Sequence, residues 1–127
     1  MPNSRNSEST EMYLETILKE SLRHPDVHAI HIASAMGFSK PSVSVAMKNL
    51  REQGYITVDE ESHIHLTESG LAIANSVYER HQVLTRLFEG LGVSPETAEQ
   101  DACRIEHCIS EETFAAIKKH AKNYGVL

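Results

Sequence analysis

The strongest constraint on the fold is the order of elements between residues 30 and 67. Residues 30–36 follow a short amphipathic helical pattern that ends at Gly37, and a second helical pattern begins at Ser39. Serine is a favoured residue at helix N-termini, and Pro41 is tolerated in a first helical turn. Two helices joined at a glycine-containing turn predict a helix-turn-helix.

Two short strands are predicted directly after the second helix. Residues 55–58 and 63–67 alternate apolar and polar side chains, and the acidic segment 59–62 separates them. This pattern is typical of a β-hairpin, and a hairpin at this place indicates the wing of a winged helix-turn-helix domain. The alternative interpretation is a small α+β packing unit without a ligand.

The second helix of this motif has the side chains that DNA recognition needs. Short polar residues at its start let the helix end approach base edges, while lysines reach the phosphates. From their positions on this helix we expect Ser44, Lys40 and Lys48 to contact DNA.

Helical patterns lie on both sides of this motif. Residues 1–8 are polar and are expected to be loose, and Ser9 or Thr10 is expected to cap the first helix. A long helix is predicted over 71–91, and two more follow, the last with an apolar stripe that reaches Tyr124. The sequence therefore predicts a mostly α fold with a small β-hairpin wing: a winged helix-turn-helix domain over 1–70 and a helical domain over 71–127. Apolar surface left over on the second domain would form a dimer interface.

Composition limits the classes of function. The chain has 127 residues and a formal net charge of −6, so contact with DNA must depend on a local basic patch or on bound cations. Eight histidines and two cysteines make metal chemistry worth testing. No signal peptide and no apolar run long enough to span a membrane is visible, so a cytoplasmic protein without a membrane partner is expected.

A cluster of metal-binding residue types lies in the predicted helix after Pro95. At about 100° per residue, Cys103, Glu106 and His107 fall on one helical face, and Glu99 joins that face one turn earlier. Thiolate, carboxylate and imidazole are ligands of divalent transition metals. The alternative is that Cys103 is a small buried hydrophobic residue and the other side chains are solvated.

Five segments together resemble one family. They are Glu11-Met12-Tyr13-Leu14, Ser39-Lys40-Pro41-Ser42-Val43-Ser44, Leu66-Thr67-Glu68-Ser69-Gly70, Arg80-His81 and Ala102-Cys103-Arg104-Ile105-Glu106-His107. In this order they resemble the diphtheria toxin repressor family of iron- and manganese-dependent transcriptional regulators, over nearly the whole chain. The resemblance implies a homodimer that binds a palindromic DNA operator when metal is bound, most simply as a repressor of metal-uptake genes.

The resemblance also assigns residues by position. The primary metal ligands of iron-type members correspond to Met12, Cys103, Glu106 and His107. A second metal site is implied at His81, and Glu99 stands where some members have a neighbouring ligand. The positions used at DNA correspond to Ser39, Pro41 and Ser42. By itself, a lone histidine such as His81 in the middle of a helix is more often a surface residue, and a methionine such as Met12 more often fills a core.

Three departures from the family pattern refine these expectations. Thr85 stands where a carboxylate is expected one turn after His81, which weakens the second site. The sequence carries no SH3-like domain after the helices, so it resembles the short form. Met12 and Cys103 replace acidic residues of manganese sensors, and soft sulfur ligands favour Fe²⁺, with Mn²⁺ possible and Co²⁺, Ni²⁺ or Zn²⁺ as substitutes in vitro.

The expected mechanism is a metal ion that holds the first helix and the ligand-bearing helix together, so that the recognition helices of a dimer match their half-sites. Two alternatives stay open. One is a regulator in which the metal is structural or the Cys103 thiolate senses oxidants. The other is a zinc hydrolase with Glu106 as general base, although no oxyanion donors or substrate loop are evident and no small organic substrate is expected.

Overall fold

The computed structural model describes residues 7–123 and 125. The chain divides into two compact units, Met1–Asn75 and Ser76–Leu127, and the division falls inside the long helix α4 (Glu68–Gly90). Residues 1–6 of the expected N-terminal segment and Tyr124 of the last apolar stripe lie outside the described residues. Each unit is described by itself below.

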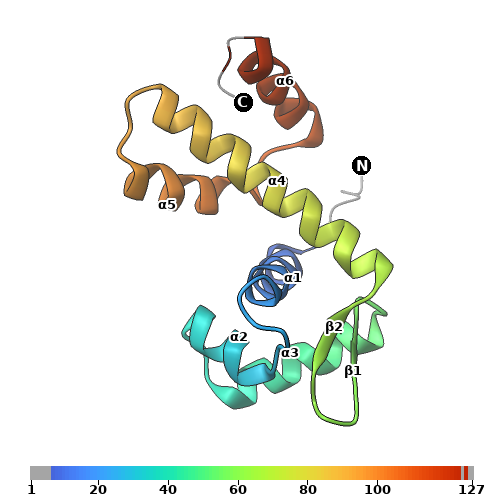
Figure 1. Cartoon of the computed structure of the whole chain (residues 1–127). Helices are drawn as coiled ribbons and strands as arrows, with labels where there is room; N and C mark the ends of the chain where they lie inside the picture. Colours follow the sequence, from blue (N-terminus) through green and yellow to red (C-terminus); the bar gives the residue numbers. More distant parts are fainter. Residues whose placement is uncertain (1–6, 124, 126–127) are drawn as a thin grey trace. The chain divides into compact units, whose positions relative to one another are not determined.

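The first unit contains three helices and a hairpin (Figure 1). In chain order they are α1 (Glu8–Ser21), α2 (Ala29–Met36), α3 (Lys40–Glu52), β1 (Ile56–Val58) and β2 (Ile64–Leu66). The strands pair antiparallel, with Thr57 opposite His65. Helix α1 packs against α2 and β2, while α3 packs against α2 and β1. The predicted mostly helical fold with a helix-turn-helix and a hairpin wing is confirmed.

One apolar core holds this unit together. Each of its elements contributes at least one buried side chain, and each strand buries its first residue. The largest fully buried members are Leu14, Ile17, Ile32 and Val43. The core also includes Tyr13, Val27, Ala33, Met47, Leu50, Ile56, Ile64 and Ala74.

Serine side chains set the starts of two helices. The Ser39 hydroxyl oxygen accepts a hydrogen bond from the Ser42 backbone N–H at 3.3 Å, so α3 begins with the cap that its sequence predicts. Helix α1 begins earlier than expected, because Ser7 rather than Ser9 or Thr10 accepts the capping hydrogen bond, from the Thr10 N–H at 3.1 Å.

A single carboxylate organises the turn of the hairpin. Asp59 Oδ1 accepts hydrogen bonds from the backbone N–H groups of Glu61 and His63, each at 2.9 Å. Its Oδ2 lies 3.0 Å from His65 Nε2. The hydrogen bond with His65, followed by those from the backbone, lowers the pKa of Asp59 from 3.8 to about 2.

This lowered pKa predicts how the hairpin responds to acid. The contribution of Asp59 to stability is complete above its unfolded-state pKa of 3.8 and is lost as the pH falls toward about 2. In an NMR titration we expect the Asp59 carboxyl carbon to titrate near pH 2, together with the amide protons of Glu61 and His63. In Asp59→Asn these amides should not respond in that range. A wild-type midpoint at 3.8 would contradict the prediction.

The second unit consists of the later part of α4 with α5 (Pro95–Ile105) and α6 (Glu111–Asn123). Its small buried residues Ala98 and Ala102 lie one turn apart on α5, where short side chains allow close helix packing. Other buried apolar members are Val77, Val83, Leu84, Phe114 and Ala121. Within the described residues, no helix is long and apolar enough to cross a membrane.

Candidate metal centre and nucleic-acid interface

A buried carboxylate lies at the centre of the candidate metal site. The Glu106 side chain has no exposed surface and follows α5 directly, as its C-cap residue. Its Oε2 lies 2.9 Å from Nδ1 of His81, and its Oε1 lies 3.3 Å from Nε2 of His107. The His81 and His107 side chains are 10% and 1% exposed. Three ionisable side chains of metal-binding type are therefore gathered in a space that excludes most water.

Each contact of Glu106 has a length that two ligands of one divalent ion can have. Ligands about 2.1 Å from one ion lie about 3.0 Å apart at neighbouring octahedral positions and about 3.4 Å apart in a tetrahedron. The two contacts of Glu106 are close to these lengths, but they are made by its two different oxygens. Within the described residues, His107 does not belong to a group of three His, Cys, Asp or Glu ligand atoms close enough for one ion. Two imidazoles and a carboxylate are also a donor set that Fe²⁺, Mn²⁺ and Zn²⁺ accept. An ion held there would add the positive charge that favours an ionised carboxylate in a buried site.

Helix α4 supports this cluster through a neighbouring arginine. Arg80 is 4% exposed, and its Nη1 donates a hydrogen bond to the Glu106 backbone oxygen at 3.3 Å. Its guanidinium lies 5.8 Å from the centre of the Phe114 ring on α6, so it joins three segments of the second unit. The sequence reasoning did not identify Arg80 in this role; its only signal was its place beside His81.

Two predicted ligands on α5 lie at the surface. Cys103 and Glu99 are exposed, whereas Ala98, Ala102 and Glu106 form the buried stripe one residue away. The helix ends at Ile105, so His107 is not on the continuous helical face that the sequence predicts. Within the described residues, neither Cys103 nor Glu99 belongs to a group of three His, Cys, Asp or Glu ligand atoms close enough for one ion.

Met12 lies in the first unit, on α1. Its side chain is half-buried and lines a pocket of about 500 Å³ with Tyr13, Met36 and Phe38. This surrounding is compatible with the gap-filling role of methionine as well as with a ligand role. Its assignment as a ligand stays a prediction.

The residues predicted to contact DNA all lie on the solvent-exposed side of α3 or at its N-cap. These are Ser39, Lys40, Pro41, Ser42, Ser44 and Lys48, and each is exposed. The buried side of the helix, with Val43, Met47 and Leu50, packs into the core. A helix fixed in this way offers small polar groups near its start and lysines along one face, as a recognition helix requires.

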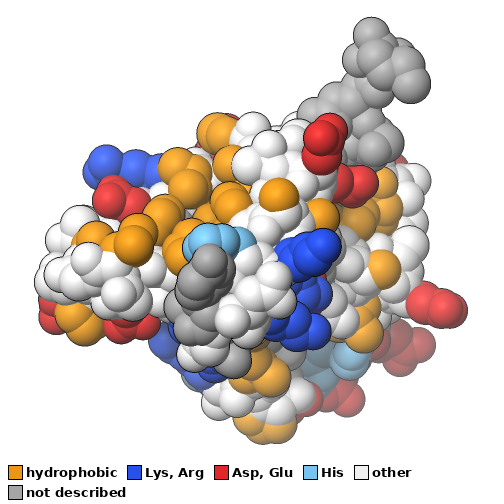
Figure 2. Space-filling model, turned by 90° about the horizontal axis from the view of Figure 1, so that it is seen from above, with side chains coloured by type: hydrophobic (Ala, Val, Ile, Leu, Met, Phe, Trp, Pro, Cys, Tyr) orange, Lys and Arg blue, Asp and Glu red, His pale blue; other side chains and the backbone are white. Residues whose placement is uncertain are grey.

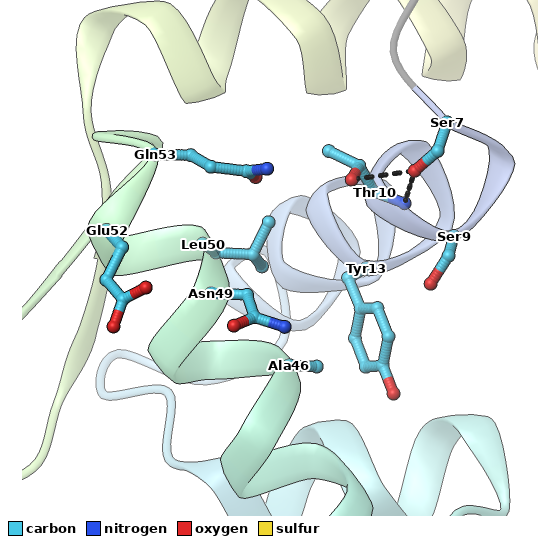
Figure 3. Close-up of a pocket in the computed structure, with 9 residues that line it drawn as sticks. All are labelled: Ser7, Ser9, Thr10, Tyr13, Ala46, Asn49, Leu50, Glu52 and Gln53. Atoms are coloured by element: carbon cyan, nitrogen blue, oxygen red, sulfur yellow. Dashed lines mark hydrogen bonds between the residues drawn. The ribbon is translucent and has the colours of Figure 1, made fainter.

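A polar pocket of about 360 Å³ lies between the start of α1 and the end of α3 (Figure 3). Asn49 of α3 and Gln53, the C-cap residue of that helix, line it, as does Tyr13 of α1. Burial raises the pKa of Tyr13, so its phenol stays neutral near pH 7. Glu52 is the only lining residue with a carboxylate and the lining has no histidine or cysteine, so this pocket is not a metal site.

Charges of both signs are mixed on the face drawn in Figure 2. On the face drawn in Figure 2, basic side chains form small groups with acidic and hydrophobic side chains beside them. The net charge of the whole chain is −6. DNA binding must therefore rely on a restricted basic surface.

Two family descriptions match the chain in succession. Residues 6–64 match "Iron dependent repressor, N-terminal DNA binding domain", and residues 67–125 match "Iron dependent repressor, metal binding and dimerisation domain". The first match covers the helix-turn-helix and the hairpin as far as the first residue of β2. The second contains His81, Glu106 and His107.

Known proteins with these domains are similar over most of the chain. The transcriptional regulator MntR of Salmonella typhimurium is 32% identical over 113 residues, which cover 89% of this chain and 72% of that protein. The iron-dependent repressor IdeR of Mycobacterium tuberculosis is 32% identical over 117 residues, or 91% of this chain and 51% of IdeR.

Solved structures agree with these sequence matches. The metal-dependent transcriptional regulator MtsR superposes with a TM-score of 0.80 at 26% identity, covering 89% of this chain and 53% of that one. A manganese-dependent transcriptional repressor in complex with manganese also gives 0.80, at 25% identity, covering 93% of this chain and 53% of that one. The chain therefore belongs to the iron-dependent, or diphtheria toxin, repressor family of metal-responsive transcriptional regulators.

Proposed function

We propose that this protein is a cytoplasmic, homodimeric repressor that binds a palindromic operator when Fe²⁺ is bound, and that it controls metal-uptake genes. The observation that carries this proposal is the buried contact of Glu106 with His81 and His107, in the part of the chain that matches a metal-binding domain. Residues 1–70 would bind DNA, and residues 71–127 would hold the metal and form the dimer.

The proposed ligand set extends beyond the three buried residues. Met12 and Cys103 stay proposed ligands because they match the family's sulfur-donor positions, while Glu99 is proposed only as a neighbouring ligand. Sulfur donors favour later transition metals over Mn²⁺, which supports Fe²⁺ as the activating ion. Relatives named for manganese and for iron both occur, so the experiment must compare the two ions.

Selection of random duplex DNA by the purified protein tests the function. It is done without oxygen in three parallel arms, with Fe²⁺, with Mn²⁺ and with chelator, at one fixed salt concentration because salt dominates apparent affinity. We expect a palindrome to be enriched in the metal arms only, and more strongly with Fe²⁺. Equal enrichment in all arms would contradict the metal switch, and no enrichment in any arm would contradict DNA binding.

The chain offers a matched pair of variants for the sulfur ligand. We expect Cys103→Ala to lose most metal-stimulated DNA binding, because a methyl group cannot coordinate the ion. Cys108→Ala, which removes the other exposed thiol, should keep the wild-type response. Anisotropy of a labelled copy of the selected DNA, titrated with metal, measures both. A wild-type response of Cys103→Ala would show that this residue is not a ligand.

Two alternative functions, a redox sensor and a hydrolytic centre, predict different experimental results. A redox sensor would keep its DNA affinity throughout a metal titration and lose it on peroxide treatment. A hydrolytic centre is not proposed, because the named relatives are transcriptional regulators. Metal-dependent ester hydrolysis that disappears in Glu106→Gln would instead support a hydrolytic centre.

A further inference from the structure

A third pocket of the first unit gathers basic groups. It has a volume of about 490 Å³ and lies between α3, the start of α2 and the hairpin. Lys40, Lys48 and Arg51 of α3 line it, and His28 lines it from the start of α2. None of its lining residues is an aspartate or glutamate. The rest of the lining is mostly apolar, so the basic side chains supply the charge of this pocket in a protein whose net charge is −6.

The three cations lie on one side of α3. At about 100° per residue, positions 40, 48 and 51 fall within about 80° of one another. Among the residues that the structure describes, none of the three forms an ion pair with a carboxylate, whereas Lys19, Arg23 and Lys118 do. Like charges around one concave surface repel one another, and an anion in the pocket would relieve that repulsion.

His28 adds an imidazole ring to the lining of this pocket. It is half-buried as the N-cap of α2, and its ring makes an edge contact with His63 at a centroid distance of 4.6 Å. Its backbone N–H donates to His31 Nδ1 at 2.9 Å, and the two rings are tilted at 5.7 Å. Within residues 7–123, no carboxylate forms an ion pair with His28.

The histidines around His28 have carboxylate neighbours of their own. His63 Nδ1 lies 3.4 Å from Asp59 and 3.6 Å from Asp26, and its Nε2 lies 3.9 Å from Glu61. His31 stacks on His24 at 4.1 Å, and His24 lies 3.4 Å from Glu20. His65 lies 3.0 Å from Asp59. Among these histidines, His28 is the one that lines the basic pocket.

We propose that this pocket holds a backbone phosphate of bound DNA, paired with Lys40, Lys48 and Arg51, and that His28 takes up a proton as the phosphate binds. The inference rests on the proposed DNA-binding function and adds two contact residues, Arg51 and His28, together with a pH dependence. Lys40 and Lys48 supply constant charge. The phosphate favours the charged imidazole of His28, which is why binding and protonation are linked.

The sign of the linkage gives the first test. Because the complex binds a proton that the free protein lacks, DNA affinity should rise as pH falls from about 7.5 to 5.5, by up to about tenfold per pH unit for one proton. Anisotropy of a labelled random-sequence duplex, at fixed salt, measures it. His28→Asn should flatten the profile, since asparagine keeps a favourable N-cap but does not titrate. His120→Gln, an exposed histidine of α6, should keep the wild-type slope.

A salt titration gives the second test. Arg51→Gln should reduce the slope of log affinity against log salt by about one, the value for one lost phosphate contact. Arg23→Gln removes one charge from the same unit without lining the pocket, and it should keep the wild-type slope. Circular dichroism of each variant checks that it is folded.

Different results would overturn the metal switch and the pocket proposal. Both titrations are run with Mn²⁺ and again with chelator at low salt, where duplex binding depends on charge rather than on the metal switch. Equal enrichment in all arms of the DNA selection, combined with a pH slope that His28→Asn abolishes, would overturn the metal switch and support the pocket. A metal response with the same pH slope in wild type and His28→Asn, or an unchanged salt slope in Arg51→Gln, would overturn the pocket proposal.

Discussion

Glu106→Gln is expected to lower the affinity of the protein for Fe²⁺ and Mn²⁺ by about 100-fold or more. The amide has the shape of the carboxylate but no negative charge, and one of its two ligand oxygens is replaced by a nitrogen that cannot coordinate. Both Glu106 oxygens contact imidazoles in a buried site, so no water or flexible side chain can easily take their place. Isothermal titration calorimetry under anaerobic conditions measures the change.

Thermal unfolding separates a lost ligand from a damaged fold. Without metal, Glu106→Gln should be about as stable as the wild type, because burying an amide is less costly than burying a carboxylate. With metal, the rise in Tm that ligand binding gives the wild type should nearly disappear. Glu112→Gln, an exposed residue in the first turn of α6, is the matched control and should keep the full rise. If metal raised the Tm of Glu106→Gln as much as that of the wild type, Glu106 would not be a ligand.

Gly70→Ala is expected to destabilise the protein by about 3 kcal/mol. Glycine-to-alanine substitutions in helices usually stabilise a protein, so the expected effect has the opposite sign. In an ordinary helix position, alanine is favoured over glycine by about 0.5–1 kcal/mol. At Gly70, an added Cβ would overlap the backbone carbonyl of Tyr55. That carbonyl oxygen accepts the Thr67 N–H at 3.0 Å, so the clash involves backbone that joins the hairpin to α4 and cannot rotate away.

Urea denaturation of Gly70→Ala measures this loss. Asn75→Ala, at an exposed position of the same helix, is the control and should change the free energy of unfolding by less than about 0.5 kcal/mol. A Gly70→Ala variant as stable as the wild type, or more stable, would show that α4 and the hairpin do not approach as closely as the structure has them.

Local patterns in the sequence predicted the first unit well. Periodicity placed the buried side of α3, serine and proline marked its start, and alternation with an acidic turn marked the hairpin. These features depend on residues close together in the chain, and their period follows from backbone geometry alone. The small errors lie at helix ends, where one capping hydrogen bond decides the boundary, as Ser7 does for α1.

The candidate metal centre was predictable only in part. The sequence placed Cys103, Glu106 and His107 within one short segment, but a helical period could not tell that α5 ends at Ile105. Nor could it tell that Glu106 continues the buried stripe of Ala102 while Cys103 is exposed. Which side of a helix is buried depends on the neighbour that packs against it.

By itself, then, the sequence determined the order of the elements, the winged helix-turn-helix and the residue types available for metal and DNA, because these follow from local periodicity and composition. Only the tertiary structure decided that His81 meets Glu106, 25 positions later in the chain, and that Lys40, Lys48 and Arg51 share a pocket with His28. Contacts between distant segments depend on how the helices pack, and the energy of that packing is spread over many side chains rather than encoded in any one motif.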